Sequence, residues 1–340
     1  VDGMAGSVNT PPNKDIRWEK TTTVNVGVDF ALFRHRLSGT IEYYNKYSVD
    51  LLAAINGSPT QGFGYTTLMT NNGKMVNRGV EITLSGEIIR QKDFSWNASL
   101  LYAFNRNKVK HISVQPSLWD SRISMPTSYP MVGKPLYGIY AYKWAGLNEN
   151  GDPQVYDAEN NVTSGPARDY HALVYCGTTV PIHNASLTNV LRYKGFEFSA
   201  MLILDAGHKL RSSNIPSINM SNGRITSTAK GIVDRWTQPG DVTDVPRLLF
   251  SNDTENFNTH RTELYRYSDL FVYDASNIRL SNISLAYRVP AHWCKKISLS
   301  GARLQFNVEN VATFAFDSKA NYDLGGKVKP NYVWGLYLNF

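Results

Sequence analysis

Hydrophobic and polar residues alternate along many stretches of the chain, which is the pattern of a β-strand with one face in an apolar environment. The last ten residues, 331–340, show it most clearly, because every second residue from Tyr332 to Phe340 is aromatic or leucine. A strand of about ten residues tilted by roughly 40° spans an apolar band about 25 Å tall. This stretch therefore predicts a strand of a membrane barrel.

Further stretches alternate in the same way, and they are joined in turn by short polar turns and long loops. We predict about nine strands, over residues 24–30, 37–44, 80–88, 94–104, 187–193, 196–204, 278–287, 302–308 and 331–340. The resulting fold class is all-β, a transmembrane antiparallel β-barrel.

Aromatic placement indicates that the apolar face meets lipid. Phe94 and Trp96 begin one strand and Tyr102 and Phe104 end it. At a rise of about 3.3 Å per residue, the first and last rings lie roughly 25 Å apart along the membrane normal. Strands of a soluble sandwich are usually nearer five or six residues and need no aromatic residues at both ends. The register predicts Leu100 on the lipid face and its neighbour Ser99 on the lumen face.

Composition agrees with a barrel and excludes a helical membrane protein. The chain has 340 residues, of which 42% are hydrophobic and 12% aromatic, and its mean hydropathy is −0.32. No apolar run approaches the roughly 18 residues that a membrane helix needs. The net charge of +7 comes without a nucleic-acid-binding fold signature, so we expect no nucleic-acid partner. Solvated loops or an acidic lipopolysaccharide surface explain the charge.

A series of short segments runs through most of the chain in a recognisable order. The segments are Ile16–Thr22, Asn25–Phe30, Asp50–Leu52, Asn77–Glu81, Asp234–Trp236, Pro246–Arg247 and Asn277–Leu285. In this serial order they resemble the SusC/RagA group of TonB-dependent transporters of Bacteroidetes, although residues 310–314 depart from the family pattern. The phenylalanine at position 340 resembles the last-strand assembly signal of outer-membrane proteins.

The resemblance implies that residues 1–340 are the C-terminal part of a barrel of about 22 strands, in a Gram-negative outer membrane. It also implies a plug in the lumen, a SusD-like surface lipoprotein over the mouth, and energy from TonB acting through the plug. The plug and the N-terminal barrel strands are absent from this sequence, and residues 1–14 contain no signal peptide pattern. About nine strands is also an odd number, whereas single-chain bacterial barrels have even numbers. We therefore expect that the chain begins inside a longer protein.

Loop lengths orient the strands, because outer-membrane barrels have short periplasmic turns and long extracellular loops. We predict periplasmic turns at 32–36, 89–93, 194–195 and 290–296, and extracellular loops at 48–75, 107–183, 205–275 and 315–329. Within the second loop, residues 137–147 and 154–156 flank a turn at 148–152 and predict a hairpin outside the membrane.

No sequence motif supports a catalytic function. The sequence contains no GxSxG, HExxH, CxxC or P-loop motif, and it implies no cofactor or metal. One candidate for a catalytic or metal-binding group consists of Asp169, His171 and His183. Ordinary loop polarity explains these residues better. The two cysteines, Cys176 and Cys294, are placed on opposite sides of the apolar band, so we expect no disulfide between them.

Two sets of side chains are candidates for binding. Aromatic rings in the loops can stack on a sugar face or pack against a peptide side chain. These candidates for contact with substrate or lid are Trp119, Tyr129, Tyr137, Tyr140, Tyr142, Trp144, Tyr170, Trp236, Tyr265 and Tyr267. Charged residues on the polar strand face are candidates for contact with the lumen or plug, and these are Asp29, Glu42, Glu81, Glu87, Arg303 and Glu309.

The sequence therefore predicts active import of glycans or peptides across the outer membrane, by the barrel of a SusCD-type complex. The expected partners are the rest of the transporter, a SusD-like lipoprotein, TonB through the plug, an oligosaccharide or peptide, and outer-membrane lipid. Two alternatives remain open, an outer-membrane adhesin or enzyme barrel and a soluble carbohydrate-binding sandwich.

Overall fold

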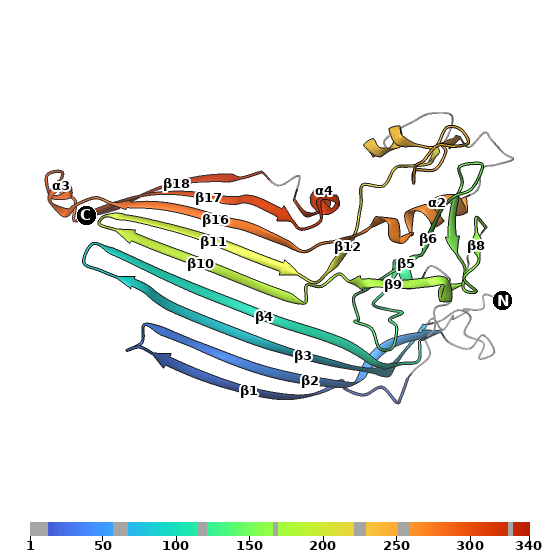
Figure 1. Ribbon diagram of the computed structural model, residues 1–340. Helices are drawn as coiled ribbons and strands as arrows, with labels where there is room; N and C mark the ends of the chain where they lie inside the picture. The colour runs from blue at the N-terminus through green and yellow to red at the C-terminus, as the bar shows by residue number, and fades with distance from the viewer. Residues whose placement is uncertain are drawn as a thin grey trace, which may run out of the picture.

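Nine long strands form one antiparallel sheet, as Figure 1 shows for the computed structural model of the chain. The structure describes residues 13–56, 67–114, 121–165, 169–220, 229–250, 259–325 and 329–340. The strands follow the order β1-β2-β3-β4-β10-β11-β16-β17-β18, so each pairs with the next one along the sheet. Their bounds are Lys20–Leu32, Leu37–Asn56, Thr67–Arg90, Phe94–Ile112, His183–Tyr193, Phe196–Ala206, Asn277–Arg288, Gly301–Ala315 and Asn331–Asn339. The predicted count of about nine strands is confirmed.

Short turns gather at one end of the sheet and long connections at the other (Figure 1). At the short-turn end, β1 joins β2, β3 joins β4, β10 joins β11, and β16 joins β17 through α3 (Ala291–Lys295). The opposite, long-loop end carries the connections from β2 to β3, β4 to β10, β11 to β16 and β17 to β18. The predicted alternation of turns and loops is therefore confirmed.

Cross-strand pairing gives the sheet one apolar face, here called the outer face. Five leucines stand opposite one another in register across five strands. They are Leu84, Leu100, Leu187, Leu202 and Leu280. Nearer the short-turn end, a row of aromatic rings crosses β4, β10, β11 and β16. It consists of Phe94, Tyr193, Phe196 and Tyr287. This registration places Leu100 on the outer face, as predicted.

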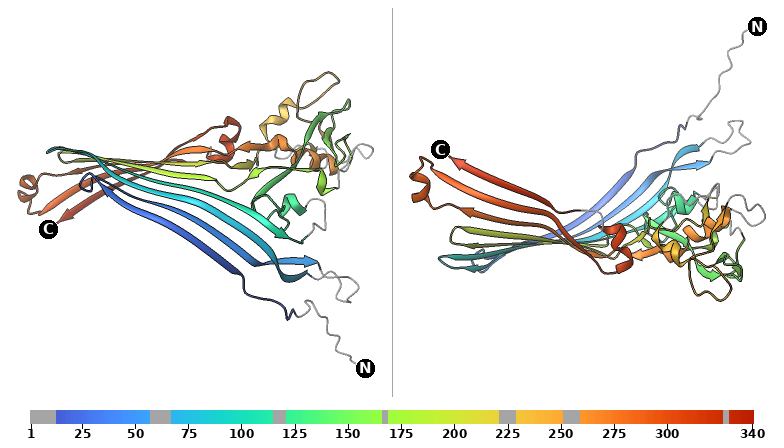
Figure 2. Two further views of the ribbon diagram at one scale, coloured as in Figure 1. Left: turned by 60° about the horizontal axis from the view of Figure 1, so that its bottom comes forward. Right: turned by 90° about the horizontal axis from the view of Figure 1, so that it is seen from above.

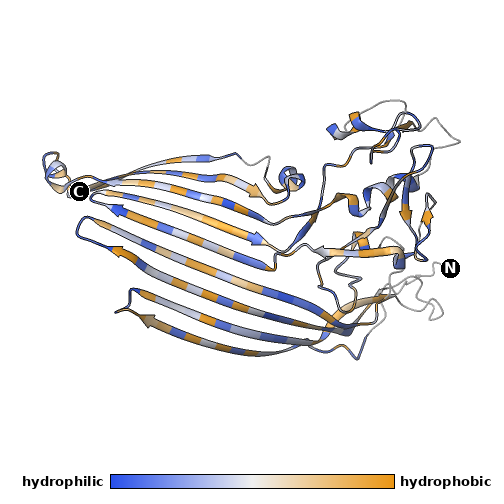
Figure 3. Cartoon of the chain, viewed as in Figure 1, coloured by the Kyte–Doolittle hydropathy of each residue, from blue (hydrophilic) through white to orange (hydrophobic). Residues whose placement is uncertain are grey.

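The opposite face is polar, and it is called the inner face. Ser99 stands between Ser85 of β3 and Thr188 of β10, so it lies in a polar row beside the leucine row. Figure 3 shows the same alternation as bands of opposite hydropathy along the strands. The sheet is strongly curved, and the two further views show it as an open trough (Figure 2). Among the described residues, no helix is long and apolar enough to cross a membrane.

Strands β2, β3 and β4 continue past the predicted ends, so the predicted loop at 48–75 is mostly strand. β2 reaches Asn56 and β3 begins at Thr67, with register shifts near Ser48 and Leu51. Asp50 has φ +56°, a conformation that interrupts the regular alternation of faces. The hairpin therefore bends at this bulge and extends beyond the level at which β10 begins.

A layer of short elements, here called the loop layer, lies beyond the long-loop end (Figure 1). β5 (Gly138–Tyr142) pairs with β9 (Leu173–Thr178), and β6 (Trp144–Leu147), β7 (Pro153–Tyr156) and β8 (Val162–Thr163) form a second small sheet. The predicted hairpin is thus correct only for 144–147 with 153–156, because β5 pairs elsewhere. The layer's remaining elements include β12 (Lys209–Arg211), β13 (Asn219–Met220), β14 (Leu249–Phe250), β15 (Val272–Asp274), α1 (Ser121–Ser124), α2 (Thr259–Arg266) and α4 (Asn321–Leu324).

Within the described ranges, four short 3-10 helices also belong to the loop layer. They are η2 (Tyr170–Ala172), η3 (Lys230–Asp234), η4 (Asp269–Phe271) and η5 (Ser318–Ala320).

Candidate functional site

The inner face contains a hollow of about 410 Å³ in the trough, on the long-loop half of the strands. Glu81 and Thr83 of β3 line it, with Asn184 and Ser186 of β10 and Asp205 of β11. The Arg279 guanidinium donates to the Asp205 carboxylate at 2.8 Å. The polar face is therefore hollowed beneath the loop layer, where a solute passing along the trough would meet charged groups.

The six lumen candidates lie on this inner face, and several have partners within the sheet. The Asp29 carboxylate accepts a hydrogen bond from Thr40 Oγ1 at 2.6 Å. Arg303 donates to Glu197 at 3.2 Å, and Arg90 lies 3.5 Å from Glu87. Glu309 accepts from Asn331 Nδ2 at 3.4 Å.

Glu42 and Glu81 stand directly opposite each other on neighbouring strands of the inner face. Two like charges in direct register destabilise a sheet by themselves. A cationic group entering the trough from outside this sheet would relieve that repulsion. These two carboxylates are consequently the part of the inner face best suited to a charged contact.

Three of the ten aromatic candidates are buried in the loop layer, which corrects their assignment as contact residues. Tyr140, Tyr142 and Tyr265 are each about 1% exposed. Tyr140 and Tyr142 pack with Val155, Ala172, Leu173 and Leu264, whereas Tyr265 packs with Ile218 and Phe271. A strand buried on both faces, as β5 is, needs large apolar side chains without any ligand. These rings form the cores of the loop layer.

Tyr137 is the most accessible of the other aromatic candidates, with 46% of its surface exposed. Tyr129, Trp144, Tyr170, Trp236 and Tyr267 are half-buried. Trp119 lies outside the described residues. The Trp144 indole donates to Asp244 at 2.9 Å, so this ring also joins two loops.

Trp236 has a structural partner in the turn between β6 and β7. Gly151 has φ +73°, and a Cβ added there would lie 2.4 Å from the Trp236 ring. Only glycine satisfies both the positive φ and the close approach of the indole. Trp236 therefore holds the long 207–276 connection against the β6–β7 turn.

A charged network that sequence reasoning missed connects the same turn to two distant segments. The Asp152 carboxylate accepts from Arg261 Nε at 2.7 Å and from Arg247 Nη2 at 2.8 Å. Arg261 is 2% exposed and also donates to the Arg247 carbonyl at 2.7 Å. Burial lowers the pKa of Arg261, although the Asp152 carboxylate opposes that effect. The Pro246–Arg247 segment carried part of the family resemblance, but nothing in the pattern indicated its partner.

Arg211 of β12 connects other parts of the loop layer. Its guanidinium donates to the carbonyl oxygens of Tyr140, Arg266 and Ser268, at 2.6, 3.2 and 3.2 Å. Burial lowers the pKa of Arg211. The loops are thus cross-linked by the buried Arg261 and the half-buried Arg211, and they form a defined surface above the trough.

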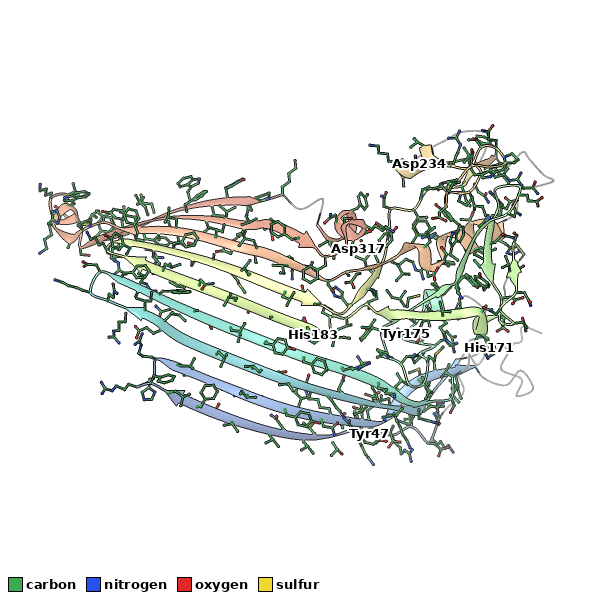
Figure 4. The ribbon with its side chains drawn as sticks, in the orientation of Figure 1. Tyr47, His171, Tyr175, His183, Asp234 and Asp317 are labelled. Atoms are coloured by element: carbon green, nitrogen blue, oxygen red, sulfur yellow. The ribbon has the colours of Figure 1, made fainter. Side chains whose placement is uncertain are left out.

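The candidate catalytic or metal-binding residues Asp169, His171 and His183 do not lie together in the structure. His171 Nδ1 lies 2.8 Å from Asp169, but His183 bonds with the Tyr102 hydroxyl at 2.9 Å and lies apart in Figure 4. Within the described ranges, no three His, Cys, Asp or Glu residues are placed to hold a metal ion. Cys176 lies in β9 of the loop layer and Cys294 in α3 at the short-turn end, and both are free thiols.

Comparison with known proteins agrees with this architecture. The family model described as "TonB dependent receptor-like, beta-barrel" matches residues 2–311. TonB-dependent receptor P3 of Formosa agariphila is 25% identical over 95% of this chain and 33% of its own length. TonB-dependent receptor SusC of Bacteroides thetaiotaomicron is 25% identical over 88% of this chain and 29% of its own length.

The structure of the RagAB peptide transporter superposes on the whole chain with a TM-score of 0.76. Sequence identity is 23%, and the match covers 37% of that chain. This likeness shows the fold of the sheet together with its loop layer. The chain spans about a third of the length of the curated relatives that it matches. It belongs to the β-barrel family of TonB-dependent receptors, within the SusC/RagA type.

Proposed function

We propose that this chain is part of the barrel of an outer-membrane importer of oligosaccharides or peptides. The observation that carries the proposal is the sheet itself, with an apolar outer face, a hollowed polar inner face and a structured loop layer at one end only. In this arrangement the short-turn end is periplasmic and the loop layer is extracellular. The names of the relatives, SusC and the RagAB peptide transporter, support nutrient import and leave both substrate classes open.

We further propose that β1 and β18 pair with additional strands of the same transporter. β1 and β18 are the two edge strands of the described sheet, and they do not pair with each other. In a bilayer, each unpaired backbone group costs several kcal/mol, so an open edge is not stable there. About 22 strands in all, as the resemblance implies, would close the barrel around a plug, and TonB would act on that plug. A positive plug side chain near Glu42 and Glu81 would compensate their repulsion.

The third part of the proposal is a SusD-like lipoprotein that covers the loop layer, with substrate held between it and the mouth. Several apolar side chains of the loop layer are exposed, including Val233 at 69% and Val242 at 102%. Exposed apolar residues that gather on a structured surface mark a protein interface, and both valines lie in the segment 229–250. The aromatic side chains that we propose to contact the lipoprotein or substrate are Tyr129, Tyr137, Trp144, Tyr170, Trp236 and Tyr267.

Point substitutions test the lid better than loop deletion. Removal of residues 137–156 would delete Tyr140, Tyr142 and Val155 from the buried core and collapse the loop layer. We expect Val233→Asp with Val242→Asp to reduce copurification of the lipoprotein at least fivefold. The control, Asn150→Asp with Gln238→Asp, adds the same charge at exposed polar positions and should retain the lipoprotein. Undiminished copurification with the valine variant would reject this lid position.

Import itself is tested in cells that lack the protein. We expect such cells to lose growth on an oligosaccharide or on a peptide mixture as sole carbon source, and cells without TonB to show the same defect. Normal growth on every glycan and peptide source tried, with unchanged uptake of labelled substrate, would reject the transport function.

A further inference from the structure

We propose that the outer face carries a site for the phosphate groups of a lipid in the leaflet at the long-loop end. The inference rests on the proposed function, because only a membrane barrel presents this face to lipid. A hollow of about 510 Å³ lies on β3 and β4 where they extend beyond β10. Five cations line it, and these are Arg78, Arg106, Lys108, Lys110 and Lys134.

The hollow has no acidic side chain in its lining. Its other lining residues are Val76, Phe104, Asn107, Gly133, Pro135 and Tyr175. Among the described residues, no ion pair includes any of the five cations. An enclosed group of cations without a carboxylate attracts an anion strongly. The site therefore favours a ligand with more than one negative charge.

Two of the cations stand opposite each other on neighbouring strands of the same face. Arg78 of β3 is the direct register partner of Arg106 of β4, and the next outer-face pair is Val76 with Lys108. Like charges directly opposite destabilise a pair of strands. Arg78 is held in place by donation from its Nε to Asn45 Oδ1 at 3.0 Å. A bound phosphate between the two guanidiniums would convert this repulsion into two charge-assisted interactions.

A loop closes the hollow on the side away from β3. Gly133 donates its backbone N–H to the Val109 carbonyl at 2.8 Å, and Val109 donates to the Lys134 carbonyl at 2.9 Å. The Lys134 ammonium lies 4.8 Å from the centre of the Tyr175 ring, which Figure 4 places beyond the end of β10 near His183. Residues far apart in the chain thus contribute to one concave site.

The position of the hollow selects a lipid over a soluble anion. Phe104 lies two residues before Arg106 on the same face, in the row predicted to end the apolar band. Two residues of a tilted strand rise about 5 Å, so the cations lie at the level of lipid headgroups. A ligand here meets apolar side chains on one side and cations on the other. A phosphorylated lipid matches both, and lipopolysaccharide belongs to this chemical class.

The same position argues against transported substrate. Substrate would pass along the inner face, whereas Arg78 and Arg106 alternate with inner-face residues and project from the outer face. The site is therefore separate from the hollow beneath the loop layer.

The test uses the complete transporter, purified in a non-ionic detergent, and measures its affinity for bisphosphorylated lipid A by native mass spectrometry. The site variant combines Arg106→Gln, Lys108→Gln, Lys110→Gln and Lys134→Gln. The control variant removes four cations at the short-turn end by Lys92→Gln, Lys194→Gln, Lys295→Gln and Lys296→Gln. We expect at least tenfold weaker binding for the site variant and less than a twofold change for the control.

Two further probes distinguish the source of the phosphate. Lipid A without phosphate groups should bind the unmodified protein at least tenfold more weakly, and millimolar inorganic phosphate should not displace bisphosphorylated lipid A. Equal binding by the site variant, an equal loss in the control variant, or full displacement by inorganic phosphate would each overturn the proposal.

If the variant with four substitutions fails to assemble, the single variants Lys108→Gln and Lys110→Gln replace it. We expect each to weaken binding about threefold. Unchanged affinity in both would likewise overturn the site. Lipid affinity is measured without transport, so normal import in cells that lack the protein would reject the proposed function and leave this result intact.

Discussion

At the residue scale, the Asp152 carboxylate joins two distant segments of the loop layer to the β6–β7 turn. It receives two arginines, one of them almost fully buried. Removing one member of a buried ion pair typically costs about 3 to 5 kcal/mol, because the remaining charge stays desolvated. We expect Asp152→Ala to lower the local unfolding free energy of β6 and β7 by an amount in that range.

Hydrogen exchange of residues 144–156 in the complete protein measures this change. Glu149→Ala is the matched control, because Glu149 is an exposed carboxylate in the same turn. Equal exchange in the two variants would show that Asp152 does not hold the turn.

Asp274 gives a pH-dependent prediction at the same scale. Burial alone would raise its pKa, but hydrogen bonds from Ser276 and the Lys209 ammonium lower it to about 2. A depressed carboxyl pKa stabilises the fold above the ordinary value near 4, and this stabilisation is lost as pH falls toward 2. We expect pepsin to cut the β12–β15 region progressively faster between pH 4 and pH 2.

The Asp274→Asn variant is the control for this acid sensitivity. Its amide carries no charge over that range, so cleavage of the β12–β15 region should change only as pepsin activity itself changes. A variant with the same acid-dependent increase as the unmodified protein would assign the effect to another group.

At the element scale, the register of the strands makes neighbouring residues respond in opposite ways. Leu100 lies in the leucine row of the outer face, and Ser99 lies in the adjacent polar row. An arginine on the lipid face near the middle of a bilayer costs roughly 2 to 4 kcal/mol. We therefore expect Leu100→Arg to reduce the yield of assembled barrel strongly, and Ser99→Arg to reduce it little. Similar losses, measured by heat-modifiable mobility on gels, would contradict the register.

The elements also show how far alternation can predict this fold. Strand number, the two faces and the turns followed from period-two patterns, because each long strand has one apolar and one polar side. The extensions to Asn56 and from Thr67 were missed, since the bulge at Asp50 breaks that period. Loop-layer strands such as β5 are apolar on both faces, so Tyr140 and Tyr142 could not be distinguished from exposed loop aromatics.

The candidate site was predictable only in part for a related reason. Inner-face charges follow from strand register, which the sequence indicates. The Asp152 network joins residues about 100 positions apart, and the cationic hollow joins β3 and β4 to the loop around Lys134. Contacts of this kind depend on how irregular segments return across the sheet, and no local periodicity encodes that path.

At the scale of the whole molecule, the curvature of the sheet and the contrast between its two faces indicate the kind of assembly to which it belongs. A curved sheet with leucines and aromatic rings outside, polar groups inside, and loops cross-linked at one end is the geometry of a barrel wall. The nine strands supply part of such a wall, and the unpaired edges of β1 and β18 are where the proposed remaining strands attach.

The most direct test is to measure which solvent each face meets in the complete protein, within a lipid bilayer. Nitroxide labels are placed on single cysteines at Leu100, Leu187, Ser99 and Thr188. Cys176, whose pKa burial raises to about 11, and the buried Cys294 are first replaced by alanine. Paramagnetic relaxation then compares access by oxygen, which enters lipid, with access by a water-soluble nickel chelate. We predict that labels at Leu100 and Leu187 are reached by oxygen and protected from nickel, with the reverse at Ser99 and Thr188. Equal nickel access at all four positions would contradict a lipid-facing outer face and, with it, the barrel.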